Sequence, residues 1–220
     1  GNTGIQISRY LVTDLWDKWP SNNLILNCTS YLNLDSGYED ADGFAAKLTI
    51  ADGNVFRGCV AYNNADDGWD LFAKQISGEI GVVTIENCIA YNNGWLTTEE
   101  LTADIKGEGN GFKLGGGNLA GGHILKNSIA FANAAKGITS NSCFDCEIYN
   151  CTSYGNSIKP GSEEYSVGLN KRTTDPMGWK VDGLISMTKD SNTKLADTVP
   201  LSLHSATNYV YNGKTSYNSL

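Results

Sequence analysis

Three carboxylates stand within five residues of one another in the segment Ala65–Phe72, which reads Ala-Asp-Asp-Gly-Trp-Asp-Leu-Phe. Like charges this close repel one another, so the segment needs either a cation or a position on a solvated turn. Oxygen ligands held close together suit Ca²⁺, which takes roughly six to eight of them. Asp66, Asp67 and Asp70 are therefore candidate calcium ligands, and a polar turn without an ion is the alternative.

Length and composition bound the kind of molecule that carries this segment. The chain has 220 residues, with 25 glycines, 18% charged residues and a net charge of −8. This length suits a single domain, and we expect one domain over residues 1–220. The negative charge argues against a nucleic-acid partner, and no apolar run is long enough to span a bilayer. We expect a monomer without a membrane partner.

A seven-residue motif recurs along the chain. Its second position is Cys or Ser, its fourth Ala or Ser, its fifth aromatic and its seventh Asn. Like residues at like positions indicate stacked rungs, which would form an asparagine ladder and an aromatic stack at the strand spacing of about 4.8 Å. The copies are Asn27–Asn33, Gly58–Asn64, Asn87–Asn93, Asn127–Asn133 and Asn150–Asn156, with weaker ones at Gly183–Met187 and Lys214–Asn218.

A second repeat lies out of phase with the first. A glycine opens a short strand, and the next residue is large and apolar. Strand alternation then turns the residue one place after the glycine inward and the residue two places after it outward. The opening glycines are Gly4, Gly43, Gly68, Gly111, Gly137 and Gly168.

The spacing of the two repeats predicts the fold. The distance from the Cys/Ser position to the following glycine varies between copies, so insertions gather at the corner between the asparagine ladder and the glycine strand. Several short strands per repeat, with loop insertions at one corner, indicate an all-β, right-handed parallel β-helix, a solenoid. A leucine-rich repeat would need a leucine consensus, and a propeller would need longer, regular blades.

The cysteines fit this repeat better than they fit a disulfide framework. Cys28, Cys59, Cys88 and Cys151 share one column in which another copy has Ser128, as expected for a small buried filler. Cys143 and Cys146 form a CxxC pair without a second pair for zinc, which leaves a local disulfide or two free thiols.

The two repeats bring the acids together. Asp42 and Asp67 each precede their glycine, and Asp70 and Lys113 each stand two places after theirs. Four carboxylates, those of Asp42, Asp66, Asp67 and Asp70, should therefore converge beside Lys113. This arrangement favours Ca²⁺ as cofactor and makes Lys113 a candidate general base that works best at alkaline pH. An exposed, solubilising lysine is the alternative for Lys113.

Other basic residues lie on or near the same predicted face. Lys47, Lys74, Lys136 and Arg172 are candidates for gripping an anionic polymer, and a solvated charge is the alternative for each. Arg172 suits the role because a guanidinium binds a carboxylate with two parallel hydrogen bonds.

Three segments closely resemble the core of polysaccharide lyase family nine pectate lyases, namely Asp42–Leu48, Ala65–Phe72 and Gly109–Gly116. The resemblance runs from Asn2 to about Asn156. It implies a secreted or periplasmic enzyme that cleaves polygalacturonate by β-elimination with Ca²⁺ and a lysine base.

The residues that match the family motif are those that the columns select. The resemblance implies that Asp42, Asp66, Asp67 and Asp70 bind calcium and that Lys113 is the base. Family members also carry a longer N-terminal part with a capping structure, whereas this chain starts inside a rung at Gly4. We therefore expect a solenoid that lacks the cap of its longer relatives.

Three other functions are compatible with the same features. One is a lyase acting on rhamnogalacturonan I, and another is a β-helical hydrolase with paired carboxylates such as Asp66 and Asp67. The third is a non-catalytic module that binds glycan or Ca²⁺. His123 and His204 are the only histidines, and neither lies in the Gly-His-Gly motif carried by polygalacturonases.

Overall fold

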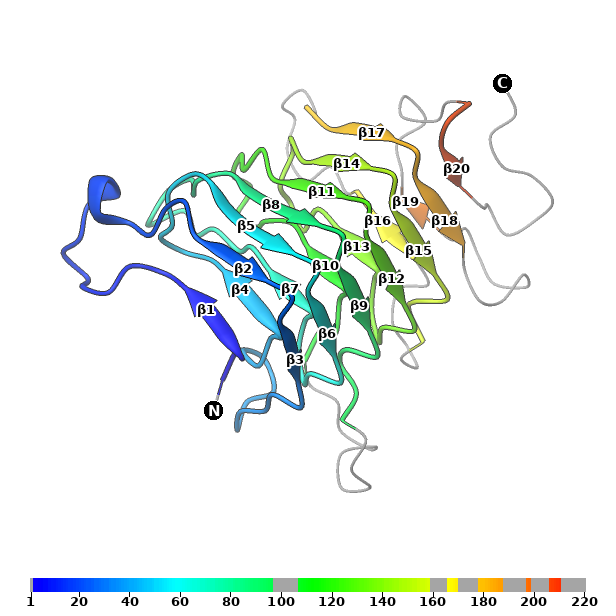
Figure 1. Ribbon diagram of the computed structural model, residues 1–220, viewed down its shortest axis with the longest axis horizontal. Helices are drawn as coiled ribbons and strands as arrows, with labels where there is room; N and C mark the ends of the chain where they lie inside the picture. The colour runs from blue at the N-terminus through cyan, green and yellow to red at the C-terminus, as the bar shows by residue number, and fades with distance from the viewer. Residues whose placement is uncertain are drawn as a thin grey trace.

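The chain winds into a parallel β-helix with three sheets along its length (Figure 1). The computed structural model describes residues 2–96, 107–158, 166–169, 178–187, 197–198 and 206–210. Within these ranges, the one helical element is a short 3-10 turn, Trp16–Lys18, and no helix has the length and apolar character needed to cross a bilayer.

Each of the first six turns of the solenoid contributes one strand to each sheet, and within the described residues the seventh contributes one to sheet A and one to sheet C; neighbouring strands pair in parallel. Sheet A contains β1 (Ile5–Ile7), β4 (Phe44–Ala46), β7 (Trp69–Asp70), β10 (Phe112–Lys113), β13 (Ile138–Thr139), β16 (Val167–Gly168) and β19 (Asp197–Thr198). Sheet B contains β2 (Leu24–Leu26), β5 (Asn54–Arg57), β8 (Val83–Glu86), β11 (Ile124–Lys126), β14 (Glu147–Tyr149) and β17 (Lys180–Asp182). Sheet C contains β3 (Thr29–Tyr31), β6 (Val60–Tyr62), β9 (Ile89–Tyr91), β12 (Ile129–Phe131), β15 (Thr152–Tyr154), β18 (Ile185–Met187) and β20 (Tyr209–Val210).

The three corners of the solenoid differ in length. The connection from sheet C to sheet A ranges from residues 63–68 to residues 92–111, so insertions gather at the predicted corner. The connection from sheet A to sheet B also varies, from residues 47–53 to residues 8–23, which the repeat spacing does not predict. Sheet A therefore has a variable connection at both ends of its strands.

The corner from sheet B to sheet C is constant, with two residues in each of the six rungs where the structure describes it. The first of the two adopts a left-handed backbone conformation, which suits Asn and Gly. The second is the Cys/Ser position, and it points into the core. The left-handed residues are Asn27, Gly58, Asn87, Asn127, Asn150 and Gly183.

The interior is filled by columns of apolar side chains. On sheet A, the Phe44 and Trp69 rings lie 4.8 Å apart and the Trp69 and Phe112 rings 4.9 Å apart, all fully buried. The six cysteines are free thiols, which resolves the alternatives for Cys143 and Cys146. Cys59, Cys88 and Cys151 are buried in their column, as expected for core fillers.

The asparagine ladder forms where sheet C ends. In the first four members Nδ2 donates a hydrogen bond of 2.7–2.9 Å to the asparagine Oδ1 of the next rung. The ladder needs the opening glycines, because a Cβ at Gly43 would lie 2.8 Å from Asn64 Nδ2 and 2.7 Å from Ala61 Cβ. The predicted ladder is confirmed, and its members are Asn33, Asn64, Asn93, Asn133 and Asn156.

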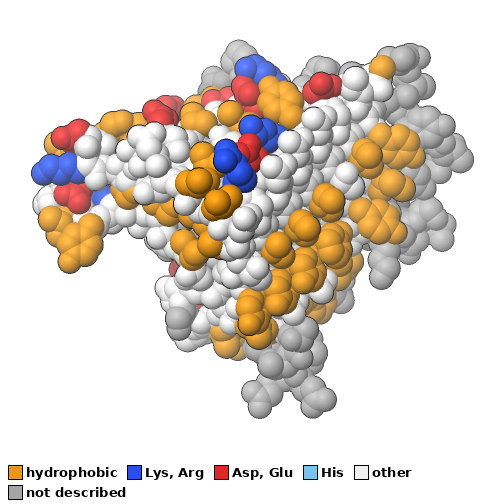
Figure 2. Space-filling model, in the orientation of Figure 1, with side chains coloured by type: hydrophobic (Ala, Val, Ile, Leu, Met, Phe, Trp, Pro, Cys, Tyr) orange, Lys and Arg blue, Asp and Glu red, His pale blue; other side chains and the backbone are white. Residues whose placement is uncertain are grey.

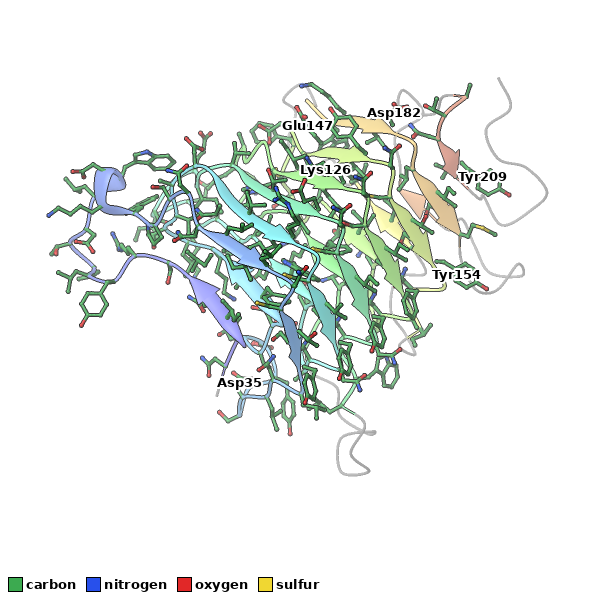
Figure 3. The ribbon with its side chains drawn as sticks, viewed as in Figure 1. Asp35, Lys126, Glu147, Tyr154, Asp182 and Tyr209 are labelled. Carbon is green, nitrogen blue, oxygen red and sulfur yellow. The ribbon has the colours of Figure 1, made fainter. Side chains whose placement is uncertain are left out.

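The aromatic stack lies on the outer face of sheet C. The rings of Tyr31, Tyr62, Tyr91 and Phe131 stack within 6° of parallel at 4.9–5.0 Å. Tyr154 is in register with Phe131 and extends the column along the sheet (Figure 3). Much of this column is exposed, and Figure 2 shows it within a band of hydrophobic side chains.

One register prediction is wrong. Gly168 pairs with Thr139, so it stands in the outward column of sheet A rather than at the opening of the strand. The opening position belongs to Ser166, whose Oγ lies 2.7 Å from Ser153 Oγ and accepts a hydrogen bond from Asn156. A serine can take the glycine position here because its hydroxyl joins the ladder instead of colliding with it.

Candidate metal centre and active site

The predicted site residues lie at the start of sheet A and on its outer face. Asp42 and Asp67 occupy the position before the opening glycine in adjacent rungs. Asp70 is paired in register with Lys113 of the next strand. Asp70 is 4% exposed and Lys113 is 9% exposed, so this outward-facing pair is nevertheless largely buried.

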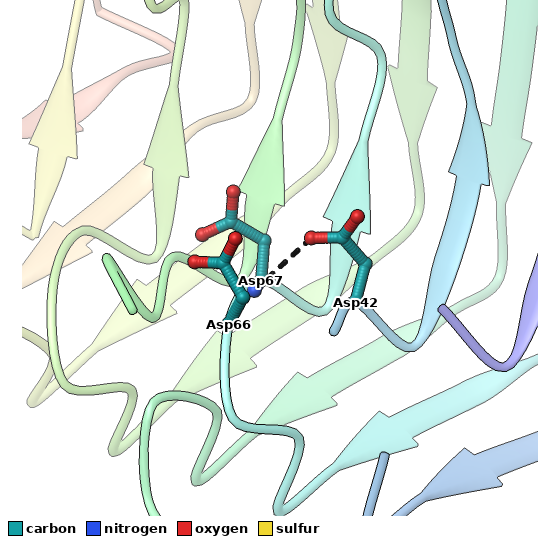
Figure 4. Close-up of side chains that lie close together, drawn as sticks. All are labelled: Asp42, Asp66 and Asp67. Atoms are coloured by element: carbon teal, nitrogen blue, oxygen red, sulfur yellow. Dashed lines mark hydrogen bonds between the residues drawn. The ribbon is translucent and has the colours of Figure 1, made fainter. Parts of the chain in front are cut away.

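Three acids come together as potential metal ligands. Asp42, Asp66 and Asp67 each offer one carboxylate oxygen that lies within 4.8 Å of the other two (Figure 4). Asp66 and Asp67 lie directly before Gly68, the last residue of the connection from β6 to β7, and Asp42 holds the matching place one rung earlier. All three side chains are nearly or completely buried.

Backbone and amide groups fix the orientation of these carboxylates. The Asp67 N–H donates to Asp42 Oδ1 at 3.3 Å, and Asp66 Oδ1 accepts the N–H of Glu108 at 2.8 Å. Asn110 donates twice to Asp67 Oδ1, from its backbone N at 2.6 Å and from Nδ2 at 2.9 Å. These donors each hold one oxygen of an acid and so fix the orientation of its carboxylate.

The fourth predicted ligand, Asp70, lies outside the trio and is held by a lysine. Lys47 Nζ donates hydrogen bonds of 2.9 Å to both Asp70 Oδ2 and Asp42 Oδ2. Asp40 Oδ1 is a third neighbour of the ammonium at 3.5 Å. Lys47, predicted as a substrate-binding residue, is thus 6% exposed and lies inside the acid cluster.

Lys113 lies on the other side of the same acids. Its Nζ is 3.1 Å from Asp67 Oδ2, 3.2 Å from Glu108 Oε2 and 3.9 Å from Asp70 Oδ1. The ammonium also lies 5.7 Å from the centre of the Phe72 ring. The structure therefore brings Lys113 to the acids, as the column argument predicts.

Without an ion, the ionised form of these buried acids is unfavourable. Burial, aided by the charges of neighbouring aspartates, raises the pKa of Asp42 to about 7 and that of Asp66 to about 10. Burial also raises the pKa of Asp67 to about 6, although the Lys113 charge opposes this shift. Burial alone would lower the pKa of Lys113, but the charges of Asp67, Asp70 and Glu108 outweigh it and raise that pKa well above its usual value.

The residues present fit a calcium ion. Oxygen ligands from several carboxylates are the donor set that Ca²⁺ prefers. Within the described part of the chain, the buried oxygens Asp67 Oδ2 and Asp70 Oδ1 accept no hydrogen bond, despite their distances to Lys113. Buried polar oxygens normally accept a hydrogen bond, whereas these two have the Lys113 ammonium as an ion-pair neighbour only, so a bound cation would add an interaction there.

The other predicted basic residues lie away from the trio. Lys136 precedes Gly137, and its backbone N donates to Asn110 Oδ1 at 3.2 Å, which places it two rungs from Asp67 in the same column. Lys74 is exposed in the connection from β7 to β8. Arg172 lies outside the described residues.

Asn110 and Glu108 are contacts of the site that the sequence reasoning misses. Both lie near the end of the long connection from β9 to β10, most of which has no counterpart in the other rungs. The available signal for Asn110 is its place before Gly111, the same position that Asp42 and Asp67 hold before their glycines. No repeat position identifies Glu108.

The chain is similar to known proteins over most of its length. Residues 1–173 match the sequence profile of the family described as Pel9A-like, right handed beta helix region. "Pectate lyase L" of Thermoclostridium stercorarium is 44% identical over 219 residues, which are 99% of this chain and 17% of that protein. "Pectate lyase L" of Paenibacillus polymyxa is 52% identical over 142 residues, which are 64% of this chain and 31% of that protein.

Two solved structures share the fold. The "Crystal structure of pectate lyase Pel9A" matches with a TM-score of 0.64 and 30% identity, over 100% of this chain and 54% of that one. A "Rhamnogalacturonan lyase" matches with a TM-score of 0.62 and 28% identity, over 83% of this chain and 47% of that one. These matches confirm the predicted right-handed β-helix and the predicted family resemblance. The chain spans about half of each solved structure and less than a third of the two relatives named above.

Proposed function

The chain belongs to the Pel9A-like right-handed β-helix family, and from this premise we propose that it carries the catalytic site of a Ca²⁺-dependent pectate lyase. The observation that supports this most is the buried trio of Asp42, Asp66 and Asp67 with Lys113 Nζ 3.1 Å from Asp67. The named relatives are pectate lyases. A polymer of galacturonate, an acidic sugar, is the proposed substrate.

Asp42, Asp66 and Asp67 would hold the ion, and Asp70 would add an oxygen from the neighbouring position on β7. When bound, Ca²⁺ would polarise the carboxylate of a galacturonate, acidify its C5 proton, and offset the acid charges that raise the pKa of Lys113. Among the described residues, Asp67 Oδ2 and Asp70 Oδ1 accept no hydrogen bond, and the ion would add to their ion pairs with Lys113.

Lys113 would act as the base at Nζ. The neutral amine takes the C5 proton, the electrons of the C–H bond form the C4–C5 double bond, and the C4–O bond breaks. The leaving oxygen keeps the electron pair of the C4–O bond and takes a proton from solvent, so the bond breaks without the addition of water. Asp70 and Glu108 remain within 3.9 Å of Lys113 Nζ and would stabilise the ammonium that forms.

The experiment is an absorbance assay with polygalacturonate. A lyase forms a conjugated, unsaturated end that absorbs in the ultraviolet, and a chelator should abolish the signal. New reducing ends without absorbance would indicate a hydrolase, and binding without either product would indicate a non-catalytic module; both outcomes contradict the proposal.

A lyase acting on rhamnogalacturonan I is the second candidate. The observation in its favour is the fold match to a "Rhamnogalacturonan lyase" at 28% identity. The same assay with rhamnogalacturonan I in place of polygalacturonate separates the two, because the preferred polymer gives the larger absorbance change at equal enzyme concentration. For either substrate we propose that the protein acts outside the cytoplasm, where plant cell-wall polymers are found.

A further inference from the structure

The Lys47 ammonium is committed to protein carboxylates. It lies 2.9 Å from Asp42 Oδ2, 2.9 Å from Asp70 Oδ2 and 3.5 Å from Asp40 Oδ1. A lysine ammonium has three N–H donors, and these three neighbours can take all of them. With 6% of the residue exposed, Lys47 has little surface to offer to a polymer.

Lys47 joins two rungs that would otherwise repel each other. Asp42 precedes β4 and Asp70 belongs to β7, the next strand of sheet A, and the ammonium lies between their carboxylates. Removing it would leave both acids buried with one fewer positive charge nearby. An uncompensated buried charge is strongly destabilising.

The Lys47 hydrogen bonds use only one oxygen of each acid that they reach. Lys47 occupies Oδ2 of Asp42 and Oδ2 of Asp70. The oxygen of Asp70 that accepts no hydrogen bond is Oδ1, and the corresponding oxygen of Asp67 is Oδ2. Before a cation enters the cluster, Lys47 thus already fixes the orientation of these two carboxylates and neutralises part of their charge.

We propose that Lys47 is a positioning residue that tunes the metal centre: it holds Asp42 and Asp70 in place without the ion and weakens Ca²⁺ binding so that the ion can exchange. The inference rests on the proposed function only in taking Ca²⁺ as the ion. A positive charge this close to buried ligands opposes a dication, and burial reduces the screening of that repulsion.

The test is a calorimetric titration of the protein with Ca²⁺ alone, alongside thermal unfolding in chelator. Lys47→Met should bind Ca²⁺ about tenfold more tightly than the native chain, because it removes the competing charge. It should also unfold at a lower temperature than the native chain in chelator. Added Ca²⁺ should raise its unfolding temperature by more than it raises that of the native chain. Lys47→Arg keeps the charge and should stay near the native affinity.

Two further variants complete the design. Lys126→Met removes a lysine paired with Glu86 on sheet B, away from the cluster, and should leave Ca²⁺ affinity unchanged. Lys47→Gln replaces the ammonium by a neutral group that still donates hydrogen bonds, and it serves if Lys47→Met does not fold. Tighter binding by the glutamine variant supports the inference in the same way.

Equal or weaker Ca²⁺ binding by both neutral variants would overturn the inference. A raised KM for polygalacturonate with unchanged Ca²⁺ affinity would instead make Lys47 a substrate-binding residue. Absence of Ca²⁺ binding by the native chain would overturn this inference together with the metal part of the proposed function. Failure to produce unsaturated ends would contradict the lyase alone, because the titration contains no substrate.

Discussion

Two columns of stacked polar side chains lie on the connection from sheet C to sheet A, the asparagine ladder at its start and the aspartates at its end. They differ in whether their members can satisfy one another's hydrogen bonds. At its start, Asn64 and Asn93 belong to a ladder in which each amide both donates and accepts. At its end, Asp42 and Asp67 stack one rung apart, and a carboxylate can only accept. The amide ladder satisfies itself, whereas the acid column takes its partners from Lys47, Lys113 and Asn110.

This difference separates a structural column from a functional one. A column that is complete without a ligand stabilises the solenoid, and nothing more is needed to explain its sequence. In the described part of the chain, the acid column leaves the buried oxygens Asp67 Oδ2 and Asp70 Oδ1 without a hydrogen bond, which carries a cost that the fold does not require. Such residues indicate a site.

The largest expected effect comes from the lysine beside the acid column. Lys113→Ala should lower the rate of unsaturated product formation by about 10²–10⁴-fold, because it removes the proposed proton acceptor. The absorbance assay with polygalacturonate measures this loss, and Ca²⁺ binding should persist. Lys126→Ala is the matched control on sheet B. A Lys113→Ala variant that keeps most of its rate would exclude the lysine as base.

Turning an acid into an amide tests the column directly. Asp67→Asn should weaken Ca²⁺ binding by about 100-fold and raise the unfolding temperature measured in chelator, because a buried carboxylate among like charges becomes neutral. Calorimetry and thermal unfolding check both effects. Asp17→Asn, on the exposed 3-10 turn, removes the same charge elsewhere and should change neither. Unchanged Ca²⁺ affinity would contradict a role for Asp67 in the metal centre.

The reverse exchange places an acid in the ladder. Asn93→Asp removes the hydrogen bonds that Nδ2 donates to Asn133 Oδ1 and Ala61 O, and it adds a buried charge. The free energy of unfolding at pH 8 should fall by about 3 kcal/mol. Urea unfolding measures the loss, which should shrink at pH 5 as the new carboxyl is protonated. A cost that does not depend on pH would show that charge is not its cause.

A pH dependence of stability is also expected in the ion-free protein. The pKa values of Asp42 and Asp67 are raised from 3.8 to about 7 and about 6 in the folded state. Their contribution to stability is fully present below about pH 4 and is lost as pH rises through 6 and 7, because the folded state binds more protons in that window.

Thermal unfolding in chelator from pH 4 to pH 8 checks this sign. Each kcal/mol lost should lower the Tm by about 2–4 °C. Saturating Ca²⁺ binds the charged carboxylates and should flatten the decline. Parallel curves with and without Ca²⁺ would show that the cluster does not cause the pH dependence.

Much of the fold follows from the sequence because stacked rungs repeat residue types. Asn133 and Tyr91 fall where their columns predict, since like residues must lie at like positions. The position of Gly168 does not, because Ser166 replaces the glycine that marks the strand in other rungs. A pattern based on one residue type fails where a different residue solves the same packing problem.

Part of the site can likewise be predicted from the sequence. The meeting of Asp42 and Lys113 with Asp67 follows from column positions alone, and the structure brings them together. The Lys47 ion pairs do not follow, because a long side chain beyond the end of β4 can point in several directions. Contacts from the connection between β9 and β10 are unpredictable for a related reason: an insertion has no counterpart in other rungs.

The constant two-residue corner between sheets B and C has a consequence for how such a protein can change. All six described rungs with this corner pass it in the same conformation, so its register tolerates no added or lost residue without displacing a core column. Length variation is confined to the corners on either side of sheet A. The loops beside the carboxylates can therefore change in length while the corner between sheets B and C keeps its conformation. Substrate preference could then change without a change in the core of the solenoid.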